Sequence, residues 1–148
     1  MSNQSDYRDL LSLFEKERVE YLVVGAHAVT YYTEPRFTKD LDLLVRPTPD
    51  NAQRVWQALG EFGAPLQSVK PEDFSNPQLI YQIGVEPIRV DIIMSIKGVS
   101  FADAWASRVP STFEGVPVNI LGKAELIRNK QAVDRPQDRL DVDRLKGC

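Results

Sequence analysis

The chain has 148 residues, of which 43% are hydrophobic and 26% are charged. This length suits one domain with a buried core, and the composition excludes a disordered or fibrous protein. The formal net charge is −3, so a nucleic-acid partner would need a local basic patch rather than an overall basic excess. We expect one domain over residues 1–148.

Cysteine and histidine occur once each, as Cys148 and His27. Their scarcity excludes intrachain disulfides, zinc sites of the CxxC and HExxH types, and most catalytic triads. Chemistry must then rest on carboxylates, Lys, Arg and hydroxyls. The apolar stretch 21–24 is too short to span a membrane, and the polar start lacks the features of a signal peptide, so we expect a cytoplasmic protein.

The first part of the chain alternates predicted helices and strands. Ser5 is expected to cap a helix that extends to about residue 19, and a short strand follows at 21–24. This strand stops at Gly25-Ala26 and is followed by a brief helix at 28–32. Residues 39–45 predict a second strand. Thr48 and Pro49 then open a long helix that ends before Gly63.

In the second part, residues 65–77 are polar and irregular. Two strands at 79–84 and 88–94 predict an antiparallel hairpin, and Ser100 is positioned to cap a short helix. A strand is expected at 116–121, and the helical C-terminal part spans about 122–146, interrupted at Arg135-Pro136. The predicted class is therefore α+β, with a mixed sheet packed by helices.

Asp40-Leu41-Asp42 is the sharpest local feature of the sequence. Residues i and i+2 of a strand share one face, which places the two carboxylates about 6 to 7 Å apart along the chain. Such a pair either takes up a proton with a raised pKa or binds a hard divalent cation. Asp91 is a candidate third ligand from a neighbouring strand. The alternative is a harmless pair of acids on an exposed strand face.

Gly25-Ala26 is a second feature of interest, because a strand that turns into a helix exposes backbone N–H groups at the positive helix end. Small residues there let an anion approach closely. This turn is therefore a candidate phosphate-binding site. His27 follows directly, and for it a packed or capping role is favoured over catalysis.

The segments 25–29 and 35–45 together resemble the nucleotidyltransferase superfamily that includes DNA polymerase beta. Within it, the sequence is similar to small bacterial proteins related to abortive-infection toxins, whose pattern Arg-x-Thr-x-Asp-x-Asp is matched by Arg36, Thr38, Asp40 and Asp42. The resemblance continues at 89–93 around Asp91 and at 126–141. It departs from the family at Ala26, where Gly or Ser is usual, and in its shorter length.

The resemblance implies transfer of a nucleoside monophosphate from an NTP to an acceptor hydroxyl, with tRNA or a protein as acceptor. It implies Mg²⁺ or Mn²⁺ held by Asp40 and Asp42, with Asp91 either completing a second metal site or drawing the proton from the attacking hydroxyl. Gly25, Ala26, Arg36, Thr38 and Lys130 are the candidate NTP-binding residues. Arg36 and Lys130 are alternatively solvated surface cations, and Thr38 alternatively only favours the strand.

Two other functions fit the same features. One is a noncatalytic module that binds an NTP or a partner protein in a toxin–antitoxin or defence pair. The other is transfer to a small molecule such as an aminoglycoside, with a homodimer interface in some relatives. For Arg135, Asp138 and Asp141 we expect a bracing role from the last helices, with surface ion pairs as the alternative.

Overall fold

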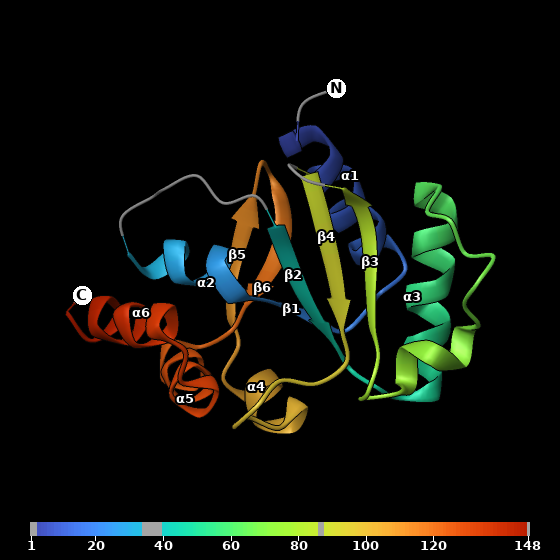
Figure 1. Cartoon of the computed structure of the whole chain (residues 1–148). Coiled ribbons are helices and arrows are strands. Elements are labelled where there is room, and N and C mark those ends of the chain that lie inside the picture. The colour runs from blue at the N-terminus through green and yellow to red at the C-terminus, as the bar shows by residue number, and fades with distance from the viewer. Residues whose placement is uncertain (1–2, 34–39, 86–87, 148) are drawn as a thin grey trace.

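The computed structural model describes residues 3–33, 40–85 and 88–147. One mixed sheet runs through this part of the chain, with its strands in the order β3-β4-β2-β1-β6-β5 (Figure 1). The strands are β1 (Tyr21–Val24), β2 (Asp40–Val45), β3 (Ile80–Val85), β4 (Ile88–Ile93), β5 (Val109–Phe113) and β6 (Val116–Ile120). This architecture confirms the predicted α+β class.

The helices separate into groups around the sheet. They are α1 (Asn3–Lys16), α2 (Gly25–Tyr32), α3 (Pro49–Phe62), α4 (Phe101–Ala106), α5 (Lys123–Val133) and α6 (Pro136–Lys146), with a 3₁₀ helix, η1 (Pro71–Ser75), after α3. Helices α1 and α3 pack on each other, whereas α2, α5 and α6 gather on the other side of β2 (Figure 1). Nothing in the described part of the chain is both long enough and apolar enough to act as a membrane-spanning helix.

Local signals account for several element ends. The side chain of Thr48 caps α3 by accepting a hydrogen bond from the Asn51 backbone N–H, and Gly63 ends this helix with a φ of 92°. The Ser100 side chain caps α4 in the same way. Helix α1 buries Tyr7, Leu10, Leu11 and Phe14, which share one helix face at i, i+3, i+4 and i+7, in the core. These sequence predictions are confirmed.

The sheet register brings distant segments together. Strand β2 pairs antiparallel with β1, so that Asp42 lies opposite Val24. On its other side β2 pairs with β4 in parallel, and Asp42 lies opposite Asp91. Strands β3 and β4 form the predicted antiparallel hairpin. The centre of the sheet therefore places β2 between the Gly25 turn and the strand that carries Asp91.

Some predicted boundaries are wrong. Helix α1 begins at Asn3 rather than after a Ser5 cap and ends at Lys16, and α2 begins at Gly25 with no unstructured turn before it. Strand β5 was not predicted. Its sequence contains Pro110, which cannot donate to a ladder and is tolerated only because β5 is the edge of the sheet. Helix α6 already begins at Pro136, within the predicted interruption, because proline suits the first helical position.

Candidate active site

The three candidate carboxylates lie on two adjacent strands. Alternation along β2 points Asp40 and Asp42 to one face, while Leu41 and Leu43 are buried on the other. Parallel pairing then places Asp91 of β4 beside Asp42. We call Asp40, Asp42 and Asp91 the carboxylate cluster. The predicted sharing of one face by the two β2 carboxylates is confirmed, and the third comes from the neighbouring strand.

Arg89 connects two members of the carboxylate cluster. It lies opposite Asp40 in the register and on the same face of β4 as Asp91. Its Nη2 donates to Asp40 Oδ2 at 3.0 Å and to Asp91 Oδ2 at 3.4 Å. Its Nε lies 3.2 Å from Asp91 Oδ1. One guanidinium therefore contacts two of the three carboxylates, and the cluster retains an excess of negative charge.

This excess changes the acidity of the cluster. The pKa of Asp42 is raised to about 7, first by burial and then by the charges of Asp91 and Asp40, while the charges of Arg89 and Lys130 oppose the rise. Burial also raises the pKa of Asp91, although the charge and hydrogen bond of Arg89 oppose this. Perturbed carboxyl groups of this kind are concentrated at functional sites. The harmless exposed pair is therefore the poorer interpretation of the Asp40-Leu41-Asp42 motif.

The Gly25 turn lies directly against Asp42. Gly25 has a φ of +67°, and a Cβ built on it would lie 2.2 Å from Asp42 Oδ2. Only glycine lets the backbone come this close to the carboxylate. Helix α2 begins at Gly25, and the preceding residue provides no side-chain cap. The first N–H groups of α2, including that of Ala26, therefore start beside the carboxylate cluster.

Lys130 is buried on α5 with 7% of its surface exposed, so its interpretation as a solvated surface cation is wrong. Its Nζ lies 3.3 Å from Asp138 Oδ1 and 3.3 Å from Asp141 Oδ2, both buried on α6. Its charge also lowers the pKa of Asp42. Arg135 completes this group by contacting Asp138. We call Lys130, Arg135, Asp138 and Asp141 the lysine cluster.

The remaining candidates fall into two groups. Arg36 and Thr38 lie outside the described residues. His27 is half-buried on α2 with its ring 5.7 Å from that of Tyr7 in an edge-to-face contact. Burial lowers the pKa of His27, and Asp40 partly opposes this. The packed role expected for His27 agrees with this contact.

The chemistry of the carboxylate cluster fits a hard divalent cation. All its donors are carboxylate oxygens, which Mg²⁺ prefers. Asp40 Oδ1 and Asp91 Oδ1 are buried, and neither receives a hydrogen bond from a described residue. Among these residues, however, no three His, Cys, Asp or Glu side chains are grouped as a preformed metal site. The donor set is therefore suitable, while Arg89 lies between two of its members.

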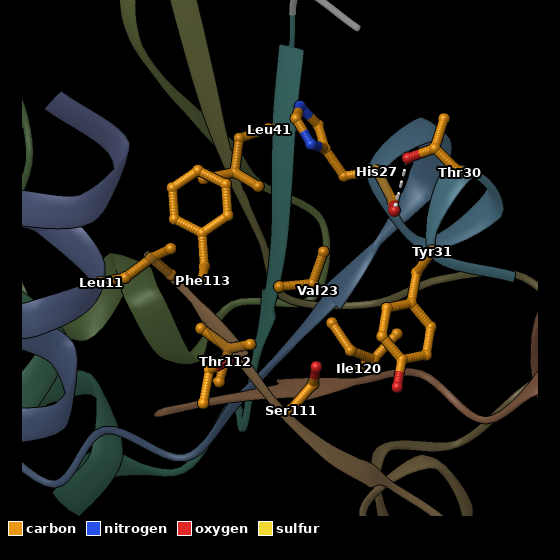
Figure 2. A pocket seen from close by; sticks show the side chains of 11 residues that line it. Leu11, Val23, His27, Thr30, Tyr31, Leu41, Ser111, Thr112, Phe113 and Ile120 are labelled. Atoms are coloured by element: carbon orange, nitrogen blue, oxygen red, sulfur yellow. Dashed lines mark hydrogen bonds between the residues drawn. The ribbon is translucent and has the colours of Figure 1, made fainter. Parts of the chain in front are cut away.

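A separate cavity of about 230 Å³ lies behind this site (Figure 2). Leu41 and Val23 line it, and the pleat places both on the sheet face opposite Asp40 and Asp42. His27 borders its upper end, and Phe113 of β5 closes one side (Figure 2). The described residues that line it include no Asp, Glu, Lys or Arg. The cavity is thus not part of the carboxylate cluster.

Arg89 was not predicted as a site residue. Its signal in the sequence is its i, i+2 relation to Asp91, which places both on one face of a strand. That signal says nothing about Asp40, which reaches Arg89 only through the pairing of β2 with β4. The contact between Arg89 and Asp40 therefore cannot be predicted without the strand register.

Searches against protein-family models and curated proteins find no match to the sequence. Solved structures do match. The lincosamide antibiotic adenylyltransferase LnuA, in its lincomycin-bound form, has a TM-score of 0.61 at 17% identity, over 96% of this chain and 95% of that one. The antibiotic-resistance factor ANT(2'')-Ia has a TM-score of 0.63 at 13% identity, over 96% of this chain and 80% of its own.

A nucleotidyltransferase-like protein from Paracoccidioides brasiliensis, described as antigenic, matches with a TM-score of 0.61 at 13% identity, over 97% of this chain and 74% of that one. These similarities extend over almost all of the chain and confirm the fold expected from the sequence resemblance. The chain has the nucleotidyltransferase fold.

Proposed function

We propose that this protein transfers a nucleoside monophosphate from an NTP to an acceptor hydroxyl. The observation that carries the proposal is the carboxylate cluster itself: three acids gathered on β2 and β4, beside the Gly25 turn, in a nucleotidyltransferase fold. The excess negative charge is costly to bury, because one guanidinium cannot neutralise three carboxylates. Burial of uncompensated charge is expected at a functional site.

In the proposed reaction, the acceptor oxygen attacks the α-phosphorus of the NTP. A new P–O bond forms, the bond to the bridging oxygen of the β-phosphate breaks, and pyrophosphate leaves with that electron pair. Asp91, which lies beside Asp42 in the register, accepts the proton of the attacking hydroxyl. Asp40 and Asp42, with Asp91, hold Mg²⁺ or Mn²⁺, which when bound neutralises charge on the triphosphate.

The donor triphosphate is proposed to bind at the start of α2. The N–H groups of Gly25 and Ala26 and the positive helix end suit phosphate oxygens. Lys130 adds positive charge on this side of the sheet, held in place by Asp138 and Asp141. Arg36 and Thr38 remain proposed NTP contacts by their match to the family pattern.

The acceptor hydroxyl has two candidate sources. The sequence resemblance favours tRNA or protein. The small-molecule alternative is supported by the solved structures, since one similar chain is a lincosamide adenylyltransferase and another is complexed with adenylyl-2"-tobramycin. The net charge of −3 also disfavours a large RNA acceptor bound through its phosphates alone. A small hydroxylated compound is therefore the second acceptor class to test.

The test is to incubate the purified protein with each α-labelled NTP, Mg²⁺ or Mn²⁺, and separate acceptor pools. These pools are bacterial tRNA, lysate protein, and a panel of lincosamides and aminoglycosides. The Asp40→Ala, Asp42→Ala double variant tests dependence on the site. Asp143→Ala is the matched control, because it removes an exposed carboxylate of α6.

Label that appears in one pool with the wild type and Asp143→Ala, and is lost in the double variant, supports the proposal and identifies the acceptor class. NTP binding without labelled product in any pool would instead favour the noncatalytic module that binds an NTP or a partner protein. Label that survives in the double variant would refute the assigned site.

A further inference from the structure

Arg89 contacts two of the carboxylates that would coordinate a divalent cation. Its guanidinium touches Asp40 and Asp91 at the same time, with Nη2 3.0 Å from Asp40 Oδ2 and Nε 3.2 Å from Asp91 Oδ1. The three side chains are only partly exposed, at 29% for Arg89, 31% for Asp40 and 12% for Asp91. Partial burial strengthens this ion pair relative to a surface one.

The pairing of Arg89 with Asp40 and Asp91 does not satisfy every carboxylate oxygen. Asp40 Oδ1 and Asp91 Oδ1 are buried and receive no hydrogen bond from a described residue, although each belongs to a carboxylate that Arg89 contacts. A buried carboxylate oxygen without a donor is costly. Arg89 therefore compensates part of the charge of the cluster. Asp91 Oδ1 still lies 3.2 Å from its Nε, whereas Asp40 Oδ1 is left for a second positive group.

We propose that Arg89 is a built-in counter-ion which competes with the divalent metal for Asp40 and Asp91. This inference rests on the proposed function, because it assumes that the carboxylate cluster is the metal site. Metal binding then requires Arg89 to leave at least one of its two carboxylates. In the nucleotide-free protein, the affinity for metal is lower than three converging carboxylates would otherwise provide. Arg89 is thus a positioning residue that sets how readily the cluster accepts its metal.

The opposite role predicts the opposite result. A clamp that merely held Asp40 and Asp91 in place would preorganise the site, and its removal would weaken metal binding. A counter-ion that competes would, on removal, leave the same oxygens unpaired and strengthen metal binding. The direction of the change therefore separates the two roles.

The experiment is a titration of nucleotide-free protein with Mn²⁺ alone, followed by electron paramagnetic resonance of the free ion. Arg89→Gln is expected to bind Mn²⁺ about tenfold more tightly than the wild type, or more, since charged hydrogen bonds are lost. Arg89→Lys should fall between them, because one ammonium cannot span both carboxylates as a guanidinium does. Arg139→Gln, which breaks an exposed ion pair with Asp134, is the matched control and should match the wild type.

Equal or weaker Mn²⁺ binding by Arg89→Gln would overturn the inference. Asp42→Asn then shows whether the proposed function falls with it. If Asp42→Asn abolishes Mn²⁺ binding that the wild type and Arg89→Gln share, the metal site stands and only the competition is wrong. If neither the wild type nor Arg89→Gln binds Mn²⁺, the metal site of the proposed function is wrong as well.

A second measurement uses the wild-type protein and does not depend on how the variants fold. The Arg89 Nε–H resonance, assigned by its loss in Arg89→Lys, is followed by nuclear magnetic resonance while Mg²⁺ is added. Displacement from Asp91 should shift this resonance in step with metal occupancy. A resonance that stays unchanged at saturating Mg²⁺ would show that Arg89 keeps its partners, against the proposal.

Discussion

The carboxylate cluster and the lysine cluster use the same residue types with opposite results. In the carboxylate cluster, three acids face one guanidinium, and burial raises the pKa of Asp42 to about 7. In the lysine cluster, Asp138 and Asp141 face two cations. The hydrogen bond that Asp138 accepts from the Arg135 side chain lowers the pKa of Asp138 to about 2. The difference lies in the balance of charge, not in the kind of residue.

This contrast indicates what each cluster is for. The carboxylates of the lysine cluster have further hydrogen-bond donors within α6 and at its start. Asp138 accepts a hydrogen bond from the Arg135 backbone N–H at 3.0 Å, and Asp141 accepts one from the Gln137 side chain at 3.0 Å. It joins α5 to α6, as the bracing role expected from the sequence requires. The carboxylate cluster leaves the buried Asp40 Oδ1 without a donor among the described residues. A balanced buried network specifies structure, and the proposed function assigns the unbalanced one to metal and nucleotide.

The largest expected effect separates activity from stability. Asp42→Asn should reduce nucleotidyl transfer about 10³-fold or more, because it removes a charge aimed at the reacting centre. In metal-free buffer it should also raise the free energy of unfolding by about 1 kcal/mol, since a buried repelling carboxylate is removed. Label transfer and urea unfolding measure the two effects. Loss of both activity and stability would contradict the description of this cluster as unbalanced in charge.

Lys130→Met should destabilise the fold by about 3 to 5 kcal/mol, because it leaves Asp138 and Asp141 buried without their shared ammonium. Urea unfolding of this variant is compared with that of Arg139→Gln, whose ion pair with Asp134 is exposed on both sides. Arg139→Gln should unfold like the wild type. Equal effects of the two substitutions would show that burial does not distinguish the lysine cluster from a surface pair.

Asp138 should make stability depend on acid pH. Its folded pKa of about 2 lies below the ordinary value of 3.8, so its contribution is complete above about pH 4 and is lost as the pH falls toward 2. The loss should be on the order of 2 kcal/mol. Unfolding free energies measured from pH 5 to pH 2 test this, with Asp138→Asn as control. A wild-type slope no steeper than that of Asp138→Asn would argue against the assignment.

The smallest expected effect concerns the Gly25 turn. Gly25→Ala and Gly63→Ala both place a side chain at a positive φ, but only the first directs its Cβ into Asp42. Gly63 has nothing within 4 Å of such an atom. Gly25→Ala should therefore destabilise the protein by about 1 kcal/mol more than Gly63→Ala does. Thermal unfolding of the two variants makes the comparison, and equal losses would mean that the close approach to Asp42 carries no cost.

Much of the fold follows from local signals in the sequence. Thr48, Pro49 and Gly63 delimit α3, and the apolar spacing of α1 identifies the helix face that enters the core. The alternation Asp40-Leu41-Asp42 determines that two carboxylates share a strand face. These features depend on residues near one another in the chain, so propensity and periodicity suffice to predict them.

Only the tertiary structure decided which distant residues meet. The parallel pairing of β2 with β4 brings Arg89 to Asp40 and Asp91 to Asp42, and a shift of one residue would turn these side chains to the opposite face. Lys130 reads as an ordinary exposed cation in its helix until the packing of α5 against α6 buries it. Strand register and burial arise from contacts between segments far apart in sequence, and local patterns do not encode them.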